Sequence, residues 1–181
     1  MGRRSALADK SVERYDSPMD EHRQRAALAF TIRPARVEEA AALTDLSLRS
    51  KAVWGYEASF LARCRLAMQV KTEAIESQPH FVAEAQGRIL GFYGFEAAAE
   101  PRAVGLDYLF VEPDAIGRGV GGALWRHAVE TARNLGHRNL IVVADPNAEG
   151  FYRRMGALPI GAQASDLEPG RLLPVLRFLL E

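Results

Sequence analysis

The stretch LFVEPDAIGRGVGGAL, residues 109–124, decides the fold of this chain. It reads as a short apolar strand, a five-residue turn, and then four glycines that open a helix. Glycine lacks a Cβ, so several backbone N–H groups can approach one ligand there, and the helix adds the positive end of its dipole. The pattern predicts a binding site for an anion, and a pyrophosphate is the ligand we expect.

A dinucleotide-binding loop is the first alternative for these glycines. Gly117, Gly119 and Gly122 satisfy the spacing G-x-G-x-x-G, and Asp145 lies about twenty residues further on, as that fingerprint requires. However, residues 112–116 separate the strand from the first glycine. The loop also lies late in the chain, which leaves too few residues for several βαβ units. Both observations disfavour this alternative.

The stretch resembles the central motif of the GNAT superfamily of acyl-CoA-dependent N-acetyltransferases. That motif is a strand ending in V-x-P followed by Q/R-x-x-G-x-G/A, and it matches residues 111–113 and 116–121, with Ile116 replacing the usual Gln or Arg. A second family motif matches Ala148, the pair 151–152 and Gly156. The resemblance covers residues 28–181. It implies an α/β (α+β) fold, a mixed and twisted central sheet of about six to seven strands flanked by about four helices.

Composition agrees with one globular enzyme domain. The chain has 181 residues, of which 48% are hydrophobic and 25% charged, as is ordinary for globular proteins. Lys plus Arg equal Asp plus Glu at 23 each, so no basic field points to nucleic acid. No stretch approaches the roughly 18 apolar residues of a membrane span, no signal peptide is evident, and we expect a cytoplasmic protein. The four histidines lack the spacing of metal ligands, so we expect no metal. Cys64 is the single cysteine, which excludes an internal disulfide, and we expect it in the core.

Two segments are expected along the chain. Residues 1–27 carry charges of both signs and few large apolar groups, which predicts a flexible extension or a start placed too far upstream. Residues 28–181 are expected to form a single GNAT domain, with a Gln86-Gly87 hairpin turn and an edge or irregular strand start at Pro174. Apolar periodicity predicts strands at 30–33, 80–84, 88–95, 106–111, 139–144, 157–162 and 172–180, and helices at 37–52, 57–70, 120–135 and 147–155.

The resemblance implies acetyl-CoA as co-substrate, bound largely through main chain. The glycine loop would hold its pyrophosphate, and the end of the preceding strand would hold its pantetheine arm. Phe151 of the second motif and Asn147 just before that motif would add contacts. Asn147 is also expected to cap its helix. The residues so assigned are Leu109, Phe110, Val111, Gly117, Arg118, Gly119, Val120, Gly121, Gly122, Asn147 and Phe151.

Tyr152 and Asp107 are the expected catalytic residues. A phenol with an ordinary pKa near ~10 stays protonated at neutral pH and can donate to a departing thiolate, whose thiol pKa is about 8.5. The alternative for Tyr152 is packing alone. Asp107 is the candidate base. An ammonium has a pKa near ~10.4 and an ordinary Asp a pKa near ~3.9, so direct proton transfer between them would cost roughly 9 kcal/mol. Asp107 must therefore be desolvated or act through a water. Glu96 and then Glu57 follow as candidates.

The acceptor contacts are expected from Trp54, Tyr56, Glu57 and Glu96. The first three lie in an aromatic and charged connection between the two N-terminal helices, which in the family forms one wall of the acceptor pocket. The alternative for Trp54 and Tyr56 is that they only hold these helices together. The function implied is direct acetyl transfer to a primary amine on a small molecule, because no motif supplies a nucleophile for an acyl-enzyme. A non-catalytic acyl-CoA sensor and a protein or peptide acetyltransferase are the alternatives. No nucleic acid or membrane partner is expected, and a homodimer stays open.

Overall fold

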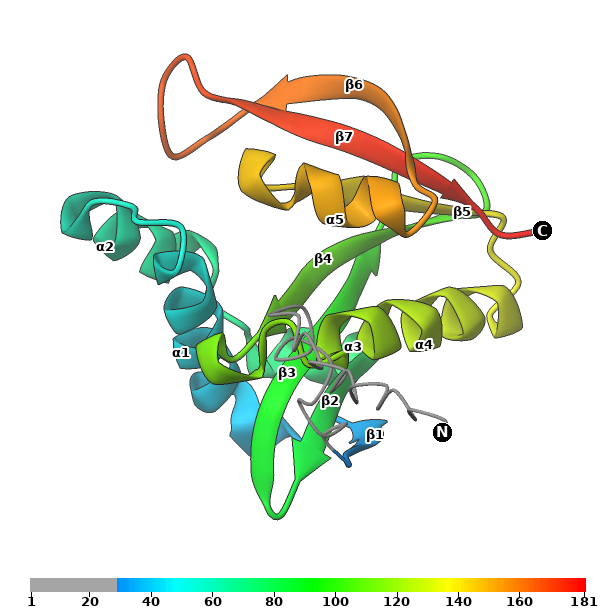
Figure 1. Ribbon diagram of the computed structural model, residues 1–181. Helices are drawn as coiled ribbons and strands as arrows, with labels where there is room; N and C mark the ends of the chain where they lie inside the picture. The colour runs from blue at the N-terminus through cyan, green and yellow to red at the C-terminus, as the bar shows by residue number, and fades with distance from the viewer. Residues whose placement is uncertain (1–28) are drawn as a thin grey trace, which may run out of the picture.

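A seven-stranded sheet forms the centre of the computed structural model, which describes residues 29–181 (Figure 1). The strand order is β1-β2-β3-β4-β5-β7-β6. Every neighbouring pair is antiparallel except β4–β5, which is parallel. The strands are β1 (Thr31–Pro34), β2 (His80–Ala85), β3 (Arg88–Ala97), β4 (Ala103–Val111), β5 (Asn139–Val143), β6 (Leu158–Ala164) and β7 (Leu172–Leu179). The predicted mixed sheet is confirmed.

Five α-helices flank this sheet within the described residues. They are α1 (Ala40–Ala52), α2 (Ala58–Ala67), α3 (Thr72–Ser77), α4 (Val120–Asn134) and α5 (Glu149–Arg154). The predicted helix 57–70 is too long, and α3 was not predicted. Val70 explains both errors, because its side chain is buried in the core and its N–H donates to Oγ1 of Thr44 at 3.0 Å. This contact directs the chain out of one helix and into the next.

The two faces of the sheet carry different helices. On one face, α4 contributes Val120, Leu124, Ala128 and Ala132, all fully buried, to the larger hydrophobic core. On the other face, α1 packs over β2, β3 and β4. Figure 1 shows α1 and α2 on one side of the strands, with α4 and α5 on the other. Leu135 was predicted to share the buried face of α4, but it is 53% exposed because the helix ends at Asn134.

The strands β4 and β5 pair over a short distance only. Residues 103–106 of β4 pair with residues 139–142 of β5, and the remaining part of β4 has a strand partner only in β3. The C-terminal ends of the two parallel strands therefore separate. This opening lies at the same end of the sheet as the glycine loop that follows Val111.

Two smaller predictions concern turns and edges. The β2–β3 hairpin turns through Gln86 and Gly87, at φ of 51° and 77°, as predicted. The expectation that Pro174 marks an edge or irregular start is confirmed for residues 172–174 of β7, which pair with β6 alone, whereas the rest of β7 lies between β5 and β6. Pro174 is tolerated because it lies beyond the last β5–β7 pair, Val143 with Val175, so no N–H is required there.

Some predictions fall outside the structure. The flexible extension predicted for residues 1–27 lies outside the described residues. Among residues 29–181, no helix has both the length and the apolar character needed to cross a membrane.

Candidate active site

The glycine loop joins the end of β4 to the first turn of α4. Glu112 donates its N–H to the carbonyl of Leu90 at 2.8 Å, and a single 3₁₀ turn follows over residues 113–115. Gly117 and Gly119 then adopt φ of 77° and 87°, a conformation that residues with a Cβ rarely take. Gly119 is the N-cap of α4.

The backbone N–H groups of this loop are available to a ligand. Within residues 29–181, no hydrogen bond engages the N–H of Gly117, of Gly119, or of residues 120–122. Free N–H groups at a helix N-terminus form a cradle for an anion, reinforced by the helix dipole. Arg118 is half-buried in the same loop, where its guanidinium has no ion-pair partner among the described residues.

The first turn of α4 passes between β4 and α5. A Cβ placed on Gly121 would lie 3.6 Å from Cγ2 of Val111 and 3.6 Å from Cε2 of Phe151. The loop, the strand end and α5 therefore converge at one point. The half-buried Phe151 ring closes one side of the cradle.

Tyr152 lies beneath this point and is 7% exposed. Its ring packs edge-on against Trp125 and Phe151, at centroid distances of 5.6 and 5.1 Å. Its hydroxyl makes no hydrogen bond to any residue of the described chain. Burial, and then the negative charge of Asp145, raise the pKa of Tyr152 above its ordinary 10.0, so the phenol is protonated at neutral pH.

Asp107 occupies a β-bulge in β4. Gly94 pairs with Tyr108 and Phe95 pairs with Leu106, so Asp107 is an extra residue with no partner on β3. The bulge also breaks the alternation of the strand, since Leu106 packs into the core beneath α4 and Tyr108 into the core beneath α1. The carboxyl group is reached by solvent, but close protein atoms desolvate it and raise its pKa.

Glu96 lies beside Asp107 on the neighbouring strand. It pairs with Gly105, and its side chain lies over that glycine. Partial burial and the negative charge of Asp107 raise the pKa of Glu96. Neither carboxylate forms an ion pair within residues 29–181. The two acids form an unneutralised negative site at the point where β4 begins to separate from β5.

A second group of side chains bridges the separated strand ends; we name Lys51, Tyr56, Phe60, Asp145 and Arg171 the cation–aromatic cluster. The Lys51 Nζ lies 2.7 Å from Oδ2 of Asp145, and the Tyr56 hydroxyl lies 2.8 and 2.9 Å from the two Asp145 oxygens. Arg171 donates to the Tyr56 hydroxyl at 2.5 Å and to Asp145 at 3.1 Å. The Tyr56 and Phe60 rings are 4.9 Å apart.

The cations of the cluster determine the charge state of Asp145. Burial alone would raise the pKa of this carboxyl, but the hydrogen bond and charge of Lys51, with the N–H of Asn147 and the Tyr56 hydroxyl, hold it below its ordinary 3.8. Asp145 is therefore ionised at neutral pH. It faces the same opening as Tyr152, whose pKa its charge raises.

A sequence comparison with protein families decides the identity of the domain. The model of the acetyltransferase (GNAT) family matches residues 43–157, which is more than half of the chain. The chain belongs to the GNAT family. An uncharacterized N-acetyltransferase from Methanocaldococcus jannaschii is 36% identical over 84 residues, which are 42% of this chain and 37% of that protein. The match thus spans little more than a third of that relative.

Solved structures share the GNAT fold. A GCN5-related N-acetyltransferase from Rhodopseudomonas palustris superposes with a TM-score of 0.72 at 22% identity, covering 87% of this chain and 99% of that one. The paia N-acetyltransferase of Thermoplasma acidophilum, in complex with coenzyme A, has a TM-score of 0.63 at 16% identity, covering 83% and 98%. The Salmonella typhimurium protein yncA, with acetyl-CoA, has a TM-score of 0.62 at 19% identity, covering 84% and 95%.

The residues predicted for the acceptor side of this GNAT domain are only partly brought together. Tyr56 is central to the cation–aromatic cluster. Trp54 is 49% exposed in the connection between α1 and α2. Glu57 is the exposed N-cap of α2 and makes no side-chain cap hydrogen bond. Glu96 lies apart from them, beside Asp107 on the sheet.

The expected cap by Asn147 is wrong. Asp145 is the N-cap of the 3₁₀ turn over residues 146–148, and its Oδ1 accepts from the Asn147 N–H at 3.0 Å. Asn147 lies within this turn, two residues after the capping position. Its side-chain amide donates instead to the Tyr56 hydroxyl at 2.9 Å.

Lys51 and Arg171 are the site residues that the sequence did not reveal. Lys51 lies in the last turn of α1 and reads as a solvent-exposed helical cation, and Arg171 reads as an ordinary loop cation. Their side chains are nevertheless only 13% and 15% exposed. The local signal for this cluster was Asp145, the acidic residue two positions after the end of β5.

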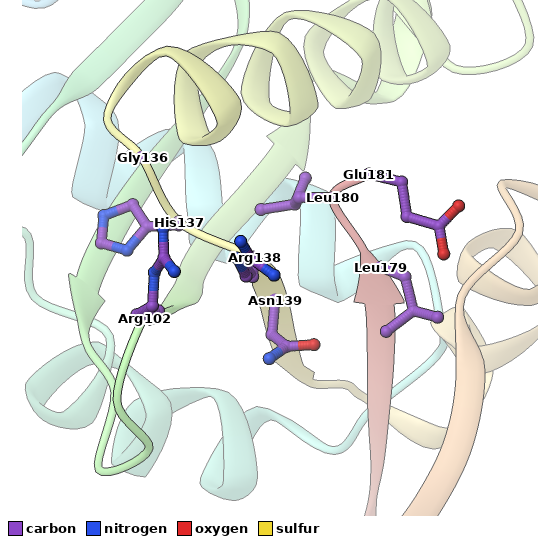
Figure 2. A pocket seen from close by; sticks show the side chains of 8 residues that line it. All are labelled: Arg102, Gly136, His137, Arg138, Asn139, Leu179, Leu180 and Glu181. Carbon is purple, nitrogen blue, oxygen red and sulfur yellow. The ribbon is translucent and has the colours of Figure 1, made fainter.

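A separate pocket lies at the opposite end of the strands. It has a volume of about 650 Å³ and is lined by residues before β4 and β5 and after β7. Figure 2 shows Arg102, His137 and Arg138 there, with Glu181 across from them. These residues precede the strands whose other ends carry the glycine loop and Asp145, so this pocket is not part of the candidate active site. Among residues 29–181, no group of His, Cys, Asp or Glu is arranged to hold a metal ion.

Proposed function

We propose that this protein is an acyl-CoA-dependent N-acetyltransferase that transfers an acetyl group directly from acetyl-CoA to a primary amine on a small molecule. One observation carries the proposal: the free N–H groups of the glycine loop adjoin an opening between β4 and β5, with the protonated hydroxyl of Tyr152 beside it. The paia and yncA structures, solved with coenzyme A and acetyl-CoA, support the choice of co-substrate.

The co-substrate would bind along features already described. The N–H groups of Gly117, Gly119 and residues 120–122 would donate to the pyrophosphate, with Arg118 adding charge. The pantetheine arm would lie along residues 109–111 of β4, which β5 leaves unpaired. Phe151 would pack against this arm. Asn147, whose amide donates to Tyr56, is a weaker candidate contact.

Two proton transfers would accompany the reaction. The acceptor ammonium must lose a proton before its nitrogen can attack the thioester carbonyl, and Asp107 would accept that proton, directly or through a water, with Glu96 beside it. A raised carboxyl pKa reduces the gap to the ammonium pKa and so makes this transfer less costly. As the C–S bond breaks, the Tyr152 hydroxyl would donate its proton to the leaving thiolate.

Direct transfer is favoured over an acyl-enzyme. Cys64 is the only thiol of the chain, and it is completely buried. Burial raises its pKa, which disfavours the nucleophilic thiolate. A free buried thiol is also compatible with a reducing compartment, and we expect the protein to act in the cytoplasm.

Thiol release from acetyl-CoA tests this proposal. The purified protein is incubated with acetyl-CoA and a panel of amino acids, polyamines, aminoglycosides, simple amines and peptides, and free CoA is measured. Acceptor-dependent release, with the acetylated amine identified by mass spectrometry, supports the transferase. Tight acetyl-CoA binding without release from any acceptor would contradict it and favour a sensor.

A further inference from the structure

The charges beside the opening are unequal. Lys51 and Arg171 share the single carboxylate of Asp145, and the side chains of all three are 13–15% exposed. Glu168 reaches Arg171 only at 3.3 Å and is 46% exposed. A third cation, Arg63, lies 5.5 Å from the centre of the Phe60 ring. In the shielded part of the cation–aromatic cluster, two cations therefore face one carboxylate, with the more exposed Glu168 and Arg63 at its margin.

The hydrogen-bond donors of the cluster outnumber its acceptors. The Asp145 carboxylate already accepts from Lys51, Tyr56, Arg171 and the Asn147 N–H. Lys51 has three N–H donors and uses one of them on Asp145, and the Arg171 Nε has no partner among the described residues. The Arg171 Nε is not one of the buried unpartnered atoms of residues 29–181, so this donor is open to solvent and accessible to a small anion.

The cluster holds its two cations at fixed places. Lys51 Nζ lies 5.2 Å from the Tyr56 ring centre, and the Arg171 guanidinium carbon lies 4.8 Å from the same centre. Both also lie within 5.7 Å of the Phe60 ring centre. Cation–π contacts and shared hydrogen bonds to Tyr56 and Asp145 thus bring two head groups within reach of one small ligand group.

The position of the cluster places it on the acceptor side. Ser50, next to Lys51, accepts from the Val111 N–H at the end of β4, with 3.4 Å between N and Oγ, while Asp145 lies two residues after the end of β5. The cluster therefore crosses the opening between the two strand ends. Asp107 lies further down β4 and Glu96 lies beside it on β3, and neither forms an ion pair within the described residues. The opening is thus negative on its sheet side and positive at its rim.

We infer that the acceptor carries a carboxylate as well as its amine, and that Lys51 and Arg171 bind this carboxylate. The inference rests on the proposed function, since it names the substrate class of that same site. The amine of the acceptor would lie toward Glu96 and Asp107. Its carboxylate would accept hydrogen bonds from the unused N–H groups of Lys51 and Arg171. Amino acids and related amino carboxylates are the class that fits this charge pattern.

Matched acceptor pairs test the inference. Each amino acid of a panel is compared with its carboxamide, which keeps the amine and the side chain but removes the negative charge. We expect kcat/KM to be about 10- to 100-fold higher for the carboxylate member, as charge-assisted hydrogen bonds predict. Equal or better use of the amides would overturn the inference while leaving the transferase intact.

Variants assign this preference to the cluster. In Lys51→Met and Arg171→Gln, the ratio of kcat/KM between carboxylate and amide should fall to about one, and Arg171→Lys should restore part of it. Arg65→Gln is the matched control, because Arg65 is exposed and pairs with Asp45 away from the opening, so the ratio should not change. An unchanged ratio in both cluster variants would overturn the assignment. Should one variant not fold, the other decides.

A binding measurement separates this inference from the transferase proposal. Calorimetry with the preferred amino acid and its amide, on the complex with CoA, reports recognition without turnover. Selective binding of the amino acid that Lys51→Met abolishes supports the inference even if no CoA is released from acetyl-CoA. Absence of such binding, or equal binding of the amide, contradicts it.

Discussion

The side chain of Glu96 occupies the space that a Cβ on Gly105 would require. The distance from an ideal Cβ at this position to Cγ of Glu96 is 2.6 Å, and to its Oε1 3.0 Å. Relief of this contact requires Glu96 to rotate about its Cα–Cβ bond or the strands to shift, and the rotation would carry the carboxylate away from Asp107. The glycine is what allows this carboxylate to lie across β4 next to Asp107.

Gly105→Ala is therefore expected to destabilise the protein by about 1–3 kcal/mol, because Glu96 and the strand pair must shift. Chemical denaturation measures this. Gly161→Ala is the control, since Gly161 lies in β6 with open space at its Cβ position and an ordinary φ. Similar free energies of unfolding for the two variants would contradict the close packing of Glu96 on Gly105.

Tyr152→Phe should lower kcat about 10- to 1,000-fold, with little change in acetyl-CoA affinity, because the ring packing is kept and only the proton donor is lost. Steady-state kinetics and equilibrium binding measure the two quantities. Tyr93→Phe is the control: its hydroxyl bonds His127 and Thr131 beneath α4, so its loss should reduce stability by about 1 kcal/mol and spare kcat. Full turnover by Tyr152→Phe would remove this residue from the mechanism.

The pH dependence of kcat/KM should reflect the ionisation of Asp107. The base must be ionised, so kcat/KM should rise with pH through an apparent pKa above the ordinary 3.8 of an aspartate, in the direction that desolvation shifts this group. Asp107→Asn should abolish that limb and lower kcat/KM by about 10²- to 10⁴-fold. Asp45→Asn, a change at an exposed residue of α1, should leave the profile unchanged. If kcat/KM of Asp107→Asn rose with pH through the same apparent pKa as in the unmodified protein, Asp107 would be excluded as the group that causes this rise.

The two glycines at the ends of α4 form a matched pair for testing the cradle. Gly119 and Gly136 have φ of 87° and 82°, so alanine at either should cost about 1–2 kcal/mol of stability. Only Gly119 adjoins the free N–H groups of the loop. Gly119→Ala should therefore weaken acetyl-CoA binding in calorimetry, and Gly136→Ala should not. Equal acetyl-CoA affinities in the two variants would disprove the role of the loop.

Local patterns were sufficient to predict most of the fold. The glycine run, the hairpin at Gln86-Gly87 and the apolar face of α4 each depend on neighbouring residues, and each appears where it was predicted. The family motif likewise depends on short spacings. These features are encoded within one or two elements, so a single sequence reveals them.

The rest of the site depends on contacts between distant residues. The β-bulge at Asp107 is a property of the pairing register between β3 and β4, which the strand sequences do not specify. Lys51 and Asp145 are 94 residues apart, and Tyr56 and Arg171 are 115 apart. Sequence periodicity relates only residues that are close in the chain. It therefore could not distinguish Lys51 and Arg171 from ordinary surface charges.

The four-residue pairing of β4 with β5 has a mechanical consequence. Among residues 29–181, it is the sole strand pairing between the half-sheet β1–β4 and the half-sheet of β5, β7 and β6. Beyond it, the side chains of the larger hydrophobic core and the Lys51–Asp145 bridge at the rim link the two half-sheets. A ligand lying in the wedge between the strand ends would therefore contact both half-sheets and brace them against each other.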